Sequence, residues 1–336
     1  MPDVPIAVAR ETAFLAMRSL GWDEESARVQ ADVMLWAELH GSNQGLTKLA
    51  SPQGMAPAPG AGKPVLERVS AVSAVVDGRG APGMLALRLA VDTAVAKARG
   101  GAGVALVGVR RTTTSSGMLA YFGERLAASG LVGILFATSP EKVSMVPGGA
   151  GVFGTNPVCF AFPTPAGRPP FVVDFATAAI AYYGVLRAKG LGQALPPGCA
   201  FDPDGRPTTD PDLALAGTLG AFGAHKGAAL ALCVELLGSA LPGAGVVADA
   251  ANPKAQSWGH TVIALDPALL VDGFAERVAT VLAAVKASHP DGVRLPGESS
   301  GAVAARNEQG GTLALPDNLW EGITQLAAQH PKKAAL

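Results

Sequence analysis

The sequence is poor in cysteine, and its three cysteines, Cys159, Cys199 and Cys233, lie far apart. Their number is odd, and two of them sit inside apolar segments, where cysteine usually acts as a small core hydrophobe. The spacing predicts neither a disulfide framework nor a zinc site. Because disulfides form and persist mainly in oxidising compartments, we expect this protein in a reducing one, the cytoplasm.

Charge is scarce as well, since charged residues make up 16% of the chain and the formal net charge is −1. Such a chain lacks the basic surplus that would indicate nucleic acid or an anionic membrane surface as a partner. Asp3, Arg10 and Glu11 precede any long apolar run, so no signal peptide is predicted. The longest apolar run, 228–237, contains Glu235 and is too short to span a bilayer.

Apolar residues, glycine and proline are abundant instead, with 49% hydrophobic residues, 42 Gly and 26 Pro. This composition is typical of a compact, turn-rich globular protein. A chain of 336 residues predicts two domains of ~150 residues each, long enough to bury a large core.

The stretch 148–178 is the part of the chain around which we expect the rest to be organised. It contains two apolar runs, 158–162 and 171–173, which are rich in β-branched and aromatic residues and predict buried strands. A tight polar corner, 154–157, leads into the first strand, and the second ends in Asp174-Phe175-Ala176-Thr177. Polar groups in that place fit either a ligand site or a helix cap with Asp174 as N-cap. The residues alone leave both interpretations open.

Four motifs occur in order along the chain. They are Gly-Thr-Asn-Pro at 154–157, Asp-Phe-Ala-Thr-Ala at 174–178, Phe-Asp-Pro-Asp-Gly-Arg-Pro-Thr-Thr-Asp-Pro at 201–211 and Leu-Pro-Gly-Glu at 295–298. With them the sequence resembles the malate/L-lactate dehydrogenase family over nearly its whole length. This is the type that is unrelated to the Rossmann-fold lactate dehydrogenases. It also contains ureidoglycolate dehydrogenase, diketogulonate reductase, sulfolactate dehydrogenase and the cyclic-imine-carboxylate reductases.

Helices and strands are predicted along the rest of the chain from the spacing of apolar residues. Gly21 closes the first helix, Asp23 fits the N-cap of the second, and 51–64 is a Pro/Gly/Ala-rich connector. The predicted helices are 6–20, 24–39, 84–99, 118–129, 179–186, 223–241, 274–288 and 318–329, and the further strands are 69–77, 104–109, 131–137 and 258–265.

These elements and the resemblance together imply an α+β enzyme. We expect a helical N-terminal unit at 1–60, a dimerisation or scaffold segment at 61–121 plus 295–336, and a nicotinamide-cofactor domain at 122–294. The resemblance implies that the cofactor domain is built on a largely antiparallel mixed sheet and is not a Rossmann fold. It also implies a homodimer with the active site between subunits.

The loop 78–83 is a literal GxGxxG between a predicted strand and a predicted helix, which is the setting of the dinucleotide-binding fingerprint. With Arg110 and Arg111 ending the next strand, it would by itself indicate a Rossmann domain that prefers NADP. Pro82 within the loop and the absence of an acidic residue at that strand end argue against this interpretation. Residues 131–175 also predict strands joined by turns rather than a β-α-β series.

Two further polar segments precede predicted helices. Thr112-Thr113-Thr114-Ser115-Ser116-Gly117 is either simple capping or a ring of hydroxyl donors around a polar ligand. His225 and Lys226 stand where the helix 223–241 begins, and free N–H groups beside a lysine predict an anion site. The alternative is an ordinary surface lysine and a capping histidine.

The resemblance also points to a loop that departs from its family. Most members carry Ser-His-Gly-x-x-Arg after the second helix, with the His as proton donor and the Arg as carboxylate clamp. The matching positions are Asn43, Gln44, Gly45 and Lys48. Lysine keeps the positive charge but is weaker in bidentate geometry, and glutamine cannot exchange a proton near neutral pH. A second family histidine falls near Thr114 and is missing too.

None of the histidines in the sequence clearly takes over the missing role. His40 lies close to Gln44 but ends the second predicted helix, where it fits a C-terminal cap. His225 is near predicted cofactor residues, and His260, His289 and His330 have no polar constellation around them.

The expected chemistry follows from this deficit. A ketone must gain a proton at oxygen as hydride arrives, whereas a cyclic imine is basic enough to arrive protonated. We therefore expect NAD(P)H-dependent reduction of a small carboxylated substrate, either a 2-oxo acid or a cyclic imine carboxylate. NADP is slightly favoured over NAD, on the hint of Arg110 and Arg111. A catalytically altered dinucleotide-binding protein of the same fold is the alternative.

The predicted site falls into three groups of residues. The catalytic group is Gln44, Lys48, Thr114, Ser115 and Tyr183, and the substrate group is Lys48, Thr155 and Asn156. The cofactor group is Ser139, Val172, Asp174, Phe175, Ala176, Thr177, Ala178, His225, Lys226, Gly297 and Glu298.

Overall fold

The centre of the fold is a seven-stranded mixed sheet. A computed structural model describes residues 2–253 and 257–330. Among the sheet's neighbouring strands only β3 and β4 run parallel, and the other pairs are antiparallel. The predicted mixed, largely antiparallel sheet is therefore confirmed. In spatial order the strands are β2 (Val65–Glu67), β3 (Ser73–Asp77), β4 (Val104–Thr112), β12 (Trp258–Leu265), β5 (Val132–Ala137), β8 (Val158–Phe162) and β9 (Phe171–Phe175).

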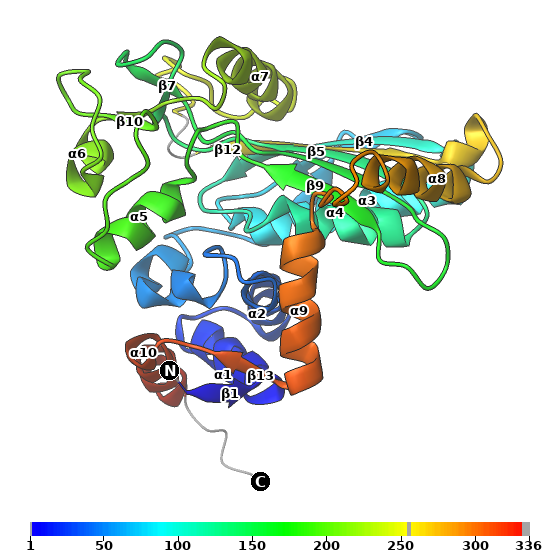
Figure 1. The fold of residues 1–336 in the computed structure, drawn as a ribbon. Coiled ribbons are helices and arrows are strands. Elements are labelled where there is room, and N and C mark those ends of the chain that lie inside the picture. The colour runs from blue at the N-terminus through cyan, green and yellow to red at the C-terminus, as the bar shows by residue number, and fades with distance from the viewer. Residues whose placement is uncertain (1, 254–256, 331–336) are drawn as a thin grey trace, which may run out of the picture.

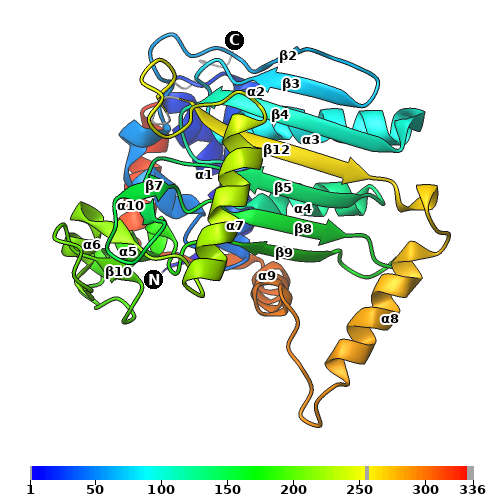
Figure 2. The same ribbon diagram turned by 90° about the horizontal axis from the view of Figure 1, so that it is seen from above.

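Helices cover both faces of this sheet (Figures 1 and 2). On one face lie α3 (Gly83–Lys97) and α4 (Leu119–Ala128), whose Phe122 and Leu126 are fully buried. Replacing either by alanine would cost ~2–5 kcal/mol, because the cavity left behind cannot close fully. On the other face α7 (His225–Glu235) lies across the strands and packs there together with the π-helical turn η4 (Leu236–Ala240).

The N-terminal unit lies beneath the sheet in Figure 1. Helix α10 packs on α1, and β1 pairs with β13, so the two ends of the described chain meet. Asp23 caps α2 by accepting a hydrogen bond from Ser26 N, and Gly21 has φ +100°, as their residue types predicted. The elements are β1 (Asp3–Pro5), α1 (Ile6–Ser19), α2 (Glu24–Leu39), η1 (Leu46–Ala50), η2 (Pro52–Met55), α9 (Glu298–Gly310), β13 (Thr312–Ala314) and α10 (Asp317–Ala328).

A smaller layer stands at the left of Figure 1 and has a core of its own, which includes Val143, Phe153 and Val185. It consists of a four-stranded sheet and two helices. The strands, in spatial order, are β10 (Ala200–Phe201), β11 (Thr218–Leu219), β6 (Val143–Ser144) and β7 (Gly151–Phe153), and the helices are α5 (Tyr182–Gly190) and α6 (Pro211–Ala216).

Helix α8 (Phe274–Lys286) differs from the others because none of its residues is buried. In Figure 2 it projects beyond β9 at the edge of the large sheet. The short π-helical turn η3 (Ala98–Ala102) follows α3, and the 3-10 turn η6 (Pro267–Leu269) follows β12.

Several predicted boundaries need correction. The boundary at 121/122 runs through one sheet, because β4 pairs with β12, a strand of the segment 122–294. The C-terminal elements join the N-terminal unit through α10 and β13. Helix α9 was not predicted, since its residues Glu298–Gly310 lack apolar periodicity. The helix expected from residue 179 begins at Tyr182, and the strand expected from residue 69 begins at Ser73.

The glycine loop 78–83 connects β3 to α3, and residues of β4 and of the loop after it pack directly against its glycines. A Cβ at Gly78 would lie 2.9 Å from Arg110 O, and one at Gly83 would lie 3.0 Å from Ser116 N. The glycines are thus required for close packing of β4 and its following loop, which explains a GxGxxG outside a Rossmann fold. Arg110 and Arg111 pair with Glu67 and Asp77 at 2.6 and 3.0 Å.

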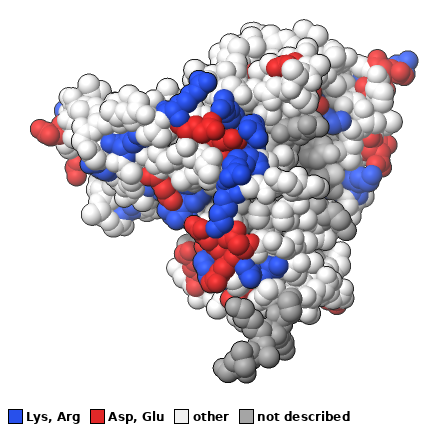
Figure 3. All heavy atoms as spheres, turned by 180° about the vertical axis from the view of Figure 1, so that it is seen from behind, with Lys and Arg blue, Asp and Glu red and all other residues white. Residues whose placement is uncertain are grey.

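The charged residues on the surface agree with the small net charge of the chain. Figure 3 shows Lys and Arg interleaved with Asp and Glu on the face seen from behind. Within the described ranges no helix is long and apolar enough to cross a membrane, and no cluster of potential metal ligands occurs. Cys159, Cys199 and Cys233 are free thiols.

Candidate active site

A cavity of about 570 Å³ opens at one end of the strands of the large sheet, where they meet the N-terminal unit and α5. The strand pairing places the last residues of β4, β5 and β9 and the first residues of β8 and β12 at this end of the sheet. Polar segments that are distant in sequence therefore converge. The lining segments are 42–44, 113–119, 137–142, 174–176 and 181–183, together with Gly54, Thr155, Pro157 and Trp258.

Four of the predicted catalytic residues form one cluster at this cavity. Lys48 Nζ donates hydrogen bonds to Gln44 Oε1 at 2.8 Å and to Ser115 Oγ at 3.2 Å. The same ammonium lies 3.8 Å from the ring centroid of Tyr183, a cation–π contact. Three segments of the chain thus hold the Lys48 side chain: the loop before η1, the loop after β4, and α5.

Lys48 itself is buried behind the cavity wall. Its exposed fraction is 3%, and it does not line the cavity, whereas its acceptors Gln44 and Ser115 do. Burial lowers its pKa to about 7. Within the described chain no carboxylate forms an ion pair with it. The predicted clamp on the substrate carboxylate would therefore have to act from behind Gln44 and Ser115.

A required glycine fixes the loop that carries Gln44 and Lys48. A Cβ at Gly45 would lie 2.8 Å from Glu38 N, so only glycine lets this loop pack on α2. Glu38 Oε2 accepts a hydrogen bond from Leu46 N at 2.8 Å, which starts η1. Burial raises the pKa of Glu38, and the bond from Leu46 N opposes that rise.

Hydroxyl groups of the run 112–117 after β4 form hydrogen bonds with nearby backbone groups. Thr113 Oγ1 donates to Gly80 O at 2.8 Å, and Ser115 Oγ accepts from Gly117 N at 3.0 Å. No side chain caps α4 at its N-cap residue, Met118. The capping interpretation of the run is therefore not what the structure shows, and Thr114 and Ser115 line the cavity instead.

Asp174 lies in β9 and not at the start of the next helix, so the N-cap interpretation, one of the two left open by the sequence, is wrong. Its Oδ2 accepts a hydrogen bond from Ala120 N at 2.9 Å, at the N-terminus of α4. Burial raises its pKa to about 6, against the opposing hydrogen bonds from Ala120 and Leu119. Asp174 also lines the cavity, so one carboxylate both satisfies a helix end and faces the site.

The cavity also brings together part of the predicted cofactor and substrate groups. Ser139, Phe175 and Ala176 line it with Asp174, and Thr155 lies beside them. Trp258 lines it too and was not predicted, because a tryptophan at a strand start carries no specific sequence signal. Its buried Nε1 has no acceptor within the described chain. A volume of this size, hydroxyls on strand ends and an unpartnered donor fit a nicotinamide cofactor.

The next predicted residues along the chain lie behind the wall. Thr177 Oγ1 donates to Thr155 O at 3.1 Å and to Asn156 O at 3.0 Å, which fixes the corner that precedes β8. Ala178 bridges to Ala221. Asn156 is fully buried, and its Nδ2 donates to Ala231 O and Glu235 Oε2 at 3.1 and 2.9 Å. The side chain of Asn156 thus turns away from the cavity, towards α7.

Besides Thr177 and Ala178, five further members of the cofactor group lie outside the cavity lining. His225 and Lys226 are exposed at the start of α7, next to the segment 177–178 through the bond from Phe222 N to Thr177 O. A Cβ on Gly297 would lie 3.2 Å from Val172 O, so these two residues meet along β9. Glu298 bonds to Lys286 and to Leu295 N. Their cofactor roles stay predictions.

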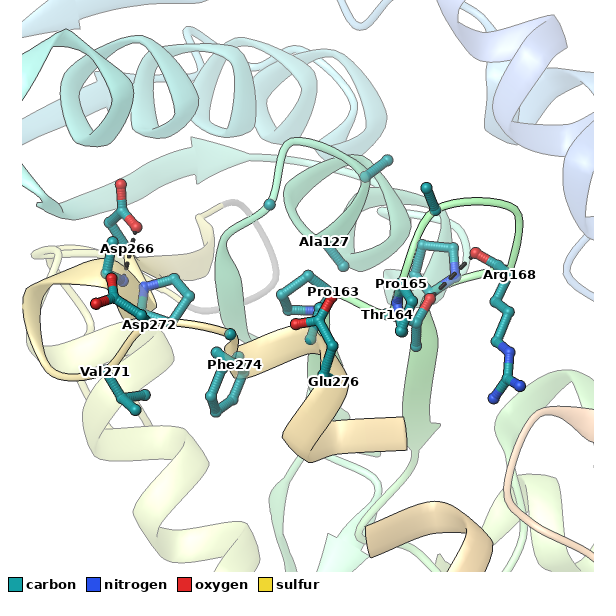
Figure 4. A pocket seen from close by; sticks show the side chains of 18 of the residues that line it. Ala127, Pro163, Thr164, Pro165, Arg168, Asp266, Val271, Asp272, Phe274 and Glu276 are labelled. Atoms are coloured by element: carbon teal, nitrogen blue, oxygen red, sulfur yellow. Dashed lines mark hydrogen bonds between the residues drawn. The ribbon is translucent and has the colours of Figure 1, made fainter. Parts of the chain in front are cut away.

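A second cavity, of about 660 Å³, lies at the opposite end of the strands of the large sheet (Figure 4). It is formed by the loop after β8, the end of β12 and the start of α8. Thr164 Oγ1 donates to Arg168 O at 3.1 Å across this loop. None of the predicted site residues lines it, and its charged residues are Arg99, Arg168, Asp266, Asp272 and Glu276. We therefore place the active site in the first cavity.

Comparison with known proteins agrees with the fold. The family model described as Malate/L-lactate dehydrogenase matches residues 4–324. The chain is 35% identical to a (2R)-3-sulfolactate dehydrogenase (NADP(+)) of Chromohalobacter salexigens over 340 residues, which cover 97% of this chain and 98% of that one. It is 40% identical to Delta(1)-pyrroline-2-carboxylate reductase 1 of Burkholderia ambifaria over 212 residues, which cover 60% and 61%.

A solved structure extends the likeness to the fold. The delta1-piperideine-2-carboxylate reductase of Pseudomonas syringae superposes with a TM-score of 0.83 at 31% identity. The match covers 97% of this chain and all of that one, 100%.

Proposed function

The chain belongs to the malate/L-lactate dehydrogenase family, and from this premise we propose which reaction its cavity carries out. The protein is an NAD(P)-dependent oxidoreductase that acts on a small carboxylated substrate. The substrate that the cavity fits best is a cyclic imine carboxylate, which is reduced at its C=N bond.

The observation that carries this proposal is the carboxylate of Asp174 in a wall without histidine. Of the described residues that line the cavity none is a histidine, and Asp174 is ionised above its pKa of about 6. A cyclic imine is basic and binds as an iminium cation, whose charge a buried carboxylate balances. No group then has to protonate the substrate while the hydride arrives.

The cofactor would lie along the strand ends. Ser139, Phe175, Ala176 and Trp258 are the residues that would hold it, and when bound it supplies the hydride. We propose NADP over NAD, because a relative that aligns over the whole chain is named for NADP(+). Arg110 and Arg111 do not support that preference, since both are engaged by carboxylates outside the cavity.

A second candidate is reduction of a 2-oxo acid at its C=O bond. A specific observation favours it: Lys48 stores a proton next to Ser115, which faces the cavity. A relative of 35% identity is named as a sulfolactate dehydrogenase, an enzyme of C–OH and C=O chemistry.

Two measurements in sequence test this proposal. Fluorescence titration with NADPH and NADH gives the affinity for each cofactor. Turnover is then followed with Δ1-pyrroline-2-carboxylate, Δ1-piperideine-2-carboxylate, pyruvate and 3-sulfopyruvate. We expect tighter binding of NADPH and faster reduction of the imines. Cofactor binding without turnover on any substrate would make this a catalytically altered binding protein, and absence of cofactor binding would remove the proposal altogether.

A homodimer in a reducing compartment completes the proposal. Exposed apolar side chains on η4, on α8 and in the turn before α8 support a partner surface, among them Leu236 at 55% exposure, Leu270 at 93% and Val281 at 61%. The free thiols fit a cytoplasmic location. Sedimentation should give twice the mass of the chain, and a monomer of unchanged activity would contradict the dimer.

A further inference from the structure

The lysine behind the cavity wall has a use that its predicted clamp role does not explain. We infer that Ser115 and Lys48 form a proton-donating pair for carbonyl substrates, with Ser115 donating to the substrate oxygen and Lys48 restoring the serine. This inference rests on the proposed function and extends it to a second substrate class in the same site.

The hydrogen bonds of Ser115 fix the direction of its own proton. A hydroxyl has two acceptor lone pairs and one donor hydrogen. Gly117 N at 3.0 Å and Lys48 Nζ at 3.2 Å both donate to Ser115 Oγ, so both lone pairs are used. The hydroxyl hydrogen must therefore point elsewhere, and Ser115 lines the cavity. A carbonyl oxygen there is the natural acceptor.

Lys48 is held in one orientation towards that serine. Gln44 Oε1 accepts a second Nζ hydrogen at 2.8 Å, and the Tyr183 ring stacks under the ammonium at 3.8 Å. This arrangement accounts for the glutamine at the position where the resemblance implies a histidine. Gln44 cannot exchange a proton itself, but its carbonyl oxygen orients the group that can.

The reduction then balances with this chain's own proton. When bound, the nicotinamide cofactor would supply a hydride to the carbonyl carbon, and the π-electron pair of the C=O bond would move onto oxygen. That oxygen takes the proton from Ser115 Oγ, and Ser115 takes one from the Lys48 ammonium. Lys48 is left as a neutral amine and regains a proton from solvent between turnovers. The product is the 2-hydroxy acid.

The surroundings of Lys48 suit a reversible proton. Its pKa of about 7 follows from burial, and a group of this pKa donates well at neutral pH. The titratable neighbours on the packed elements are Glu38 on α2 and Tyr183 on α5, with Asp174 across the cavity. On α10, which packs against η1, the acids Asp317 and Glu321 are exposed.

The test separates this role from a charge that merely holds a carboxylate. Lys48→Arg keeps the charge but holds its proton too tightly to donate it. We expect the ratio of kcat/KM for pyruvate to that for Δ1-pyrroline-2-carboxylate to fall by at least ~10²-fold in Lys48→Arg, Lys48→Met and Ser115→Ala. Lys189→Met, an exposed lysine on α5 paired with Asp212, is the control and should leave the ratio unchanged.

A second readout does not need turnover. Protein labelled at lysine Cε is titrated by carbon NMR, and one lysine signal should titrate at about pH 7 in the natural protein and be missing in Lys48→Met. In the natural protein the ratio should also fall as pH rises through the same midpoint, because the protonated lysine is the donor.

The outcomes distinguish this inference from the proposed function. A Lys48→Arg variant that keeps its ratio, or a Lys48 signal that titrates above about pH 9, overturns the proton-donating pair. Imine reduction without any carbonyl reduction by the natural protein also overturns it and leaves the proposed function standing. Loss of both reactions in the natural protein removes the proposed function as well.

Discussion

The two walls of the cavity are built in different ways. The strand-end wall, 137–142 with Thr155 and 174–176, consists of residues whose places follow from ladder pairing in the large sheet. The loop wall, 42–44 with 113–117 and Lys48 behind it, is positioned by glycines, a buried glutamate and side-chain hydrogen bonds. The sheet fixes the first wall whatever its side chains do. The second can exchange chemical groups without disturbing the sheet.

This difference would let the loop wall carry groups other than the histidines that the resemblance implies, while the strand-end wall is kept. The resemblance implies two histidines on the loop wall, at Gln44 and near Thr114. The first three residues of the motif 174–178 lie on the strand-end wall. If the walls act separately, substitutions on the loop wall should change carbonyl chemistry and leave cofactor binding alone. On the strand-end wall, substitutions other than at Asp174, which faces the substrate, should change cofactor binding. The predictions below test that separation.

The largest effect is expected at Asp174, which stands where the strand-end wall faces the substrate. Asp174→Asn should lower kcat/KM for Δ1-pyrroline-2-carboxylate by ~10²- to 10³-fold, because an amide cannot balance an iminium charge. In the natural protein imine reduction should fall as pH drops through about 6, where the carboxylate becomes protonated. A pH–rate profile of both proteins checks this. Equal rates at neutral pH would show that Asp174 only caps α4.

The buried charge of the loop wall should be visible in stability. The pKa of Lys48 is about 7 in the folded chain and 10.5 in the ordinary case, so between these values the unfolded chain binds more protons. The stability of the natural protein therefore rises with pH across this window. Lys48→Met should be more stable by about 2 kcal/mol near pH 6, after the loss of two hydrogen bonds is subtracted.

Near pH 10 the same variant should be less stable than the natural protein, because only the lost hydrogen bonds remain. Urea unfolding at both pH values gives the comparison. A stability difference that does not change with pH would show that Lys48 is not a buried charge.

A smaller effect is expected at Gln44, which orients Lys48 without exchanging protons. Gln44→Ala should lower turnover by less than ~10-fold, well below the loss of an acid–base group. Gln44→His should raise carbonyl reduction relative to imine reduction, since it introduces a proton donor. Steady-state kinetics on both substrates measure these changes. Abolished turnover in Gln44→Ala with an unaffected Lys48→Ala would mean that the loop wall is assigned wrongly.

The smallest effect is expected at Lys226, at the exposed start of α7. Lys226→Ala should weaken NADPH binding by ~2- to 5-fold at low salt, and the effect should shrink as salt is raised. Titration of NADPH at two salt concentrations tests it. An affinity that does not change at either concentration removes Lys226 from the cofactor site.

The sequence was sufficient for most helices and strands. Glu24–Leu39, Val158–Phe162 and Trp258–Leu265 have the predicted bounds, because each combines strong periodicity with clear end signals. Helix α9 was missed because Glu298–Gly310 has few apolar residues and one buried side chain, Ala304. The pairing of β4 with β12 across residue 122 was not foreseen, because strand pairing between distant segments leaves no trace in local composition. The division into domains stays a prediction.

Site residues could be predicted where a family motif lies at the end of a strand. The direction in which each side chain points could not be predicted. Asp174, Phe175 and Ala176 reach the cavity as the motif implied, while Thr177 and Asn156 turn inward to hold backbone groups. That Lys48 would be buried without a carboxylate depends on η1, α5 and the loop after β4 meeting in space. No spacing in the sequence reports such a meeting.

One matched pair of substitutions tests the separation of the two walls most directly. Ser115→Ala and Ser139→Ala remove the same hydroxyl from the loop wall and from the strand-end wall. For each variant the NADPH Kd and the ratio of carbonyl to imine reduction are measured side by side. We predict that Ser139→Ala raises Kd by ~3- to 10-fold and keeps the ratio, while Ser115→Ala keeps Kd and lowers the ratio by at least ~10²-fold. Variants that both change Kd and ratio together would contradict two separable walls.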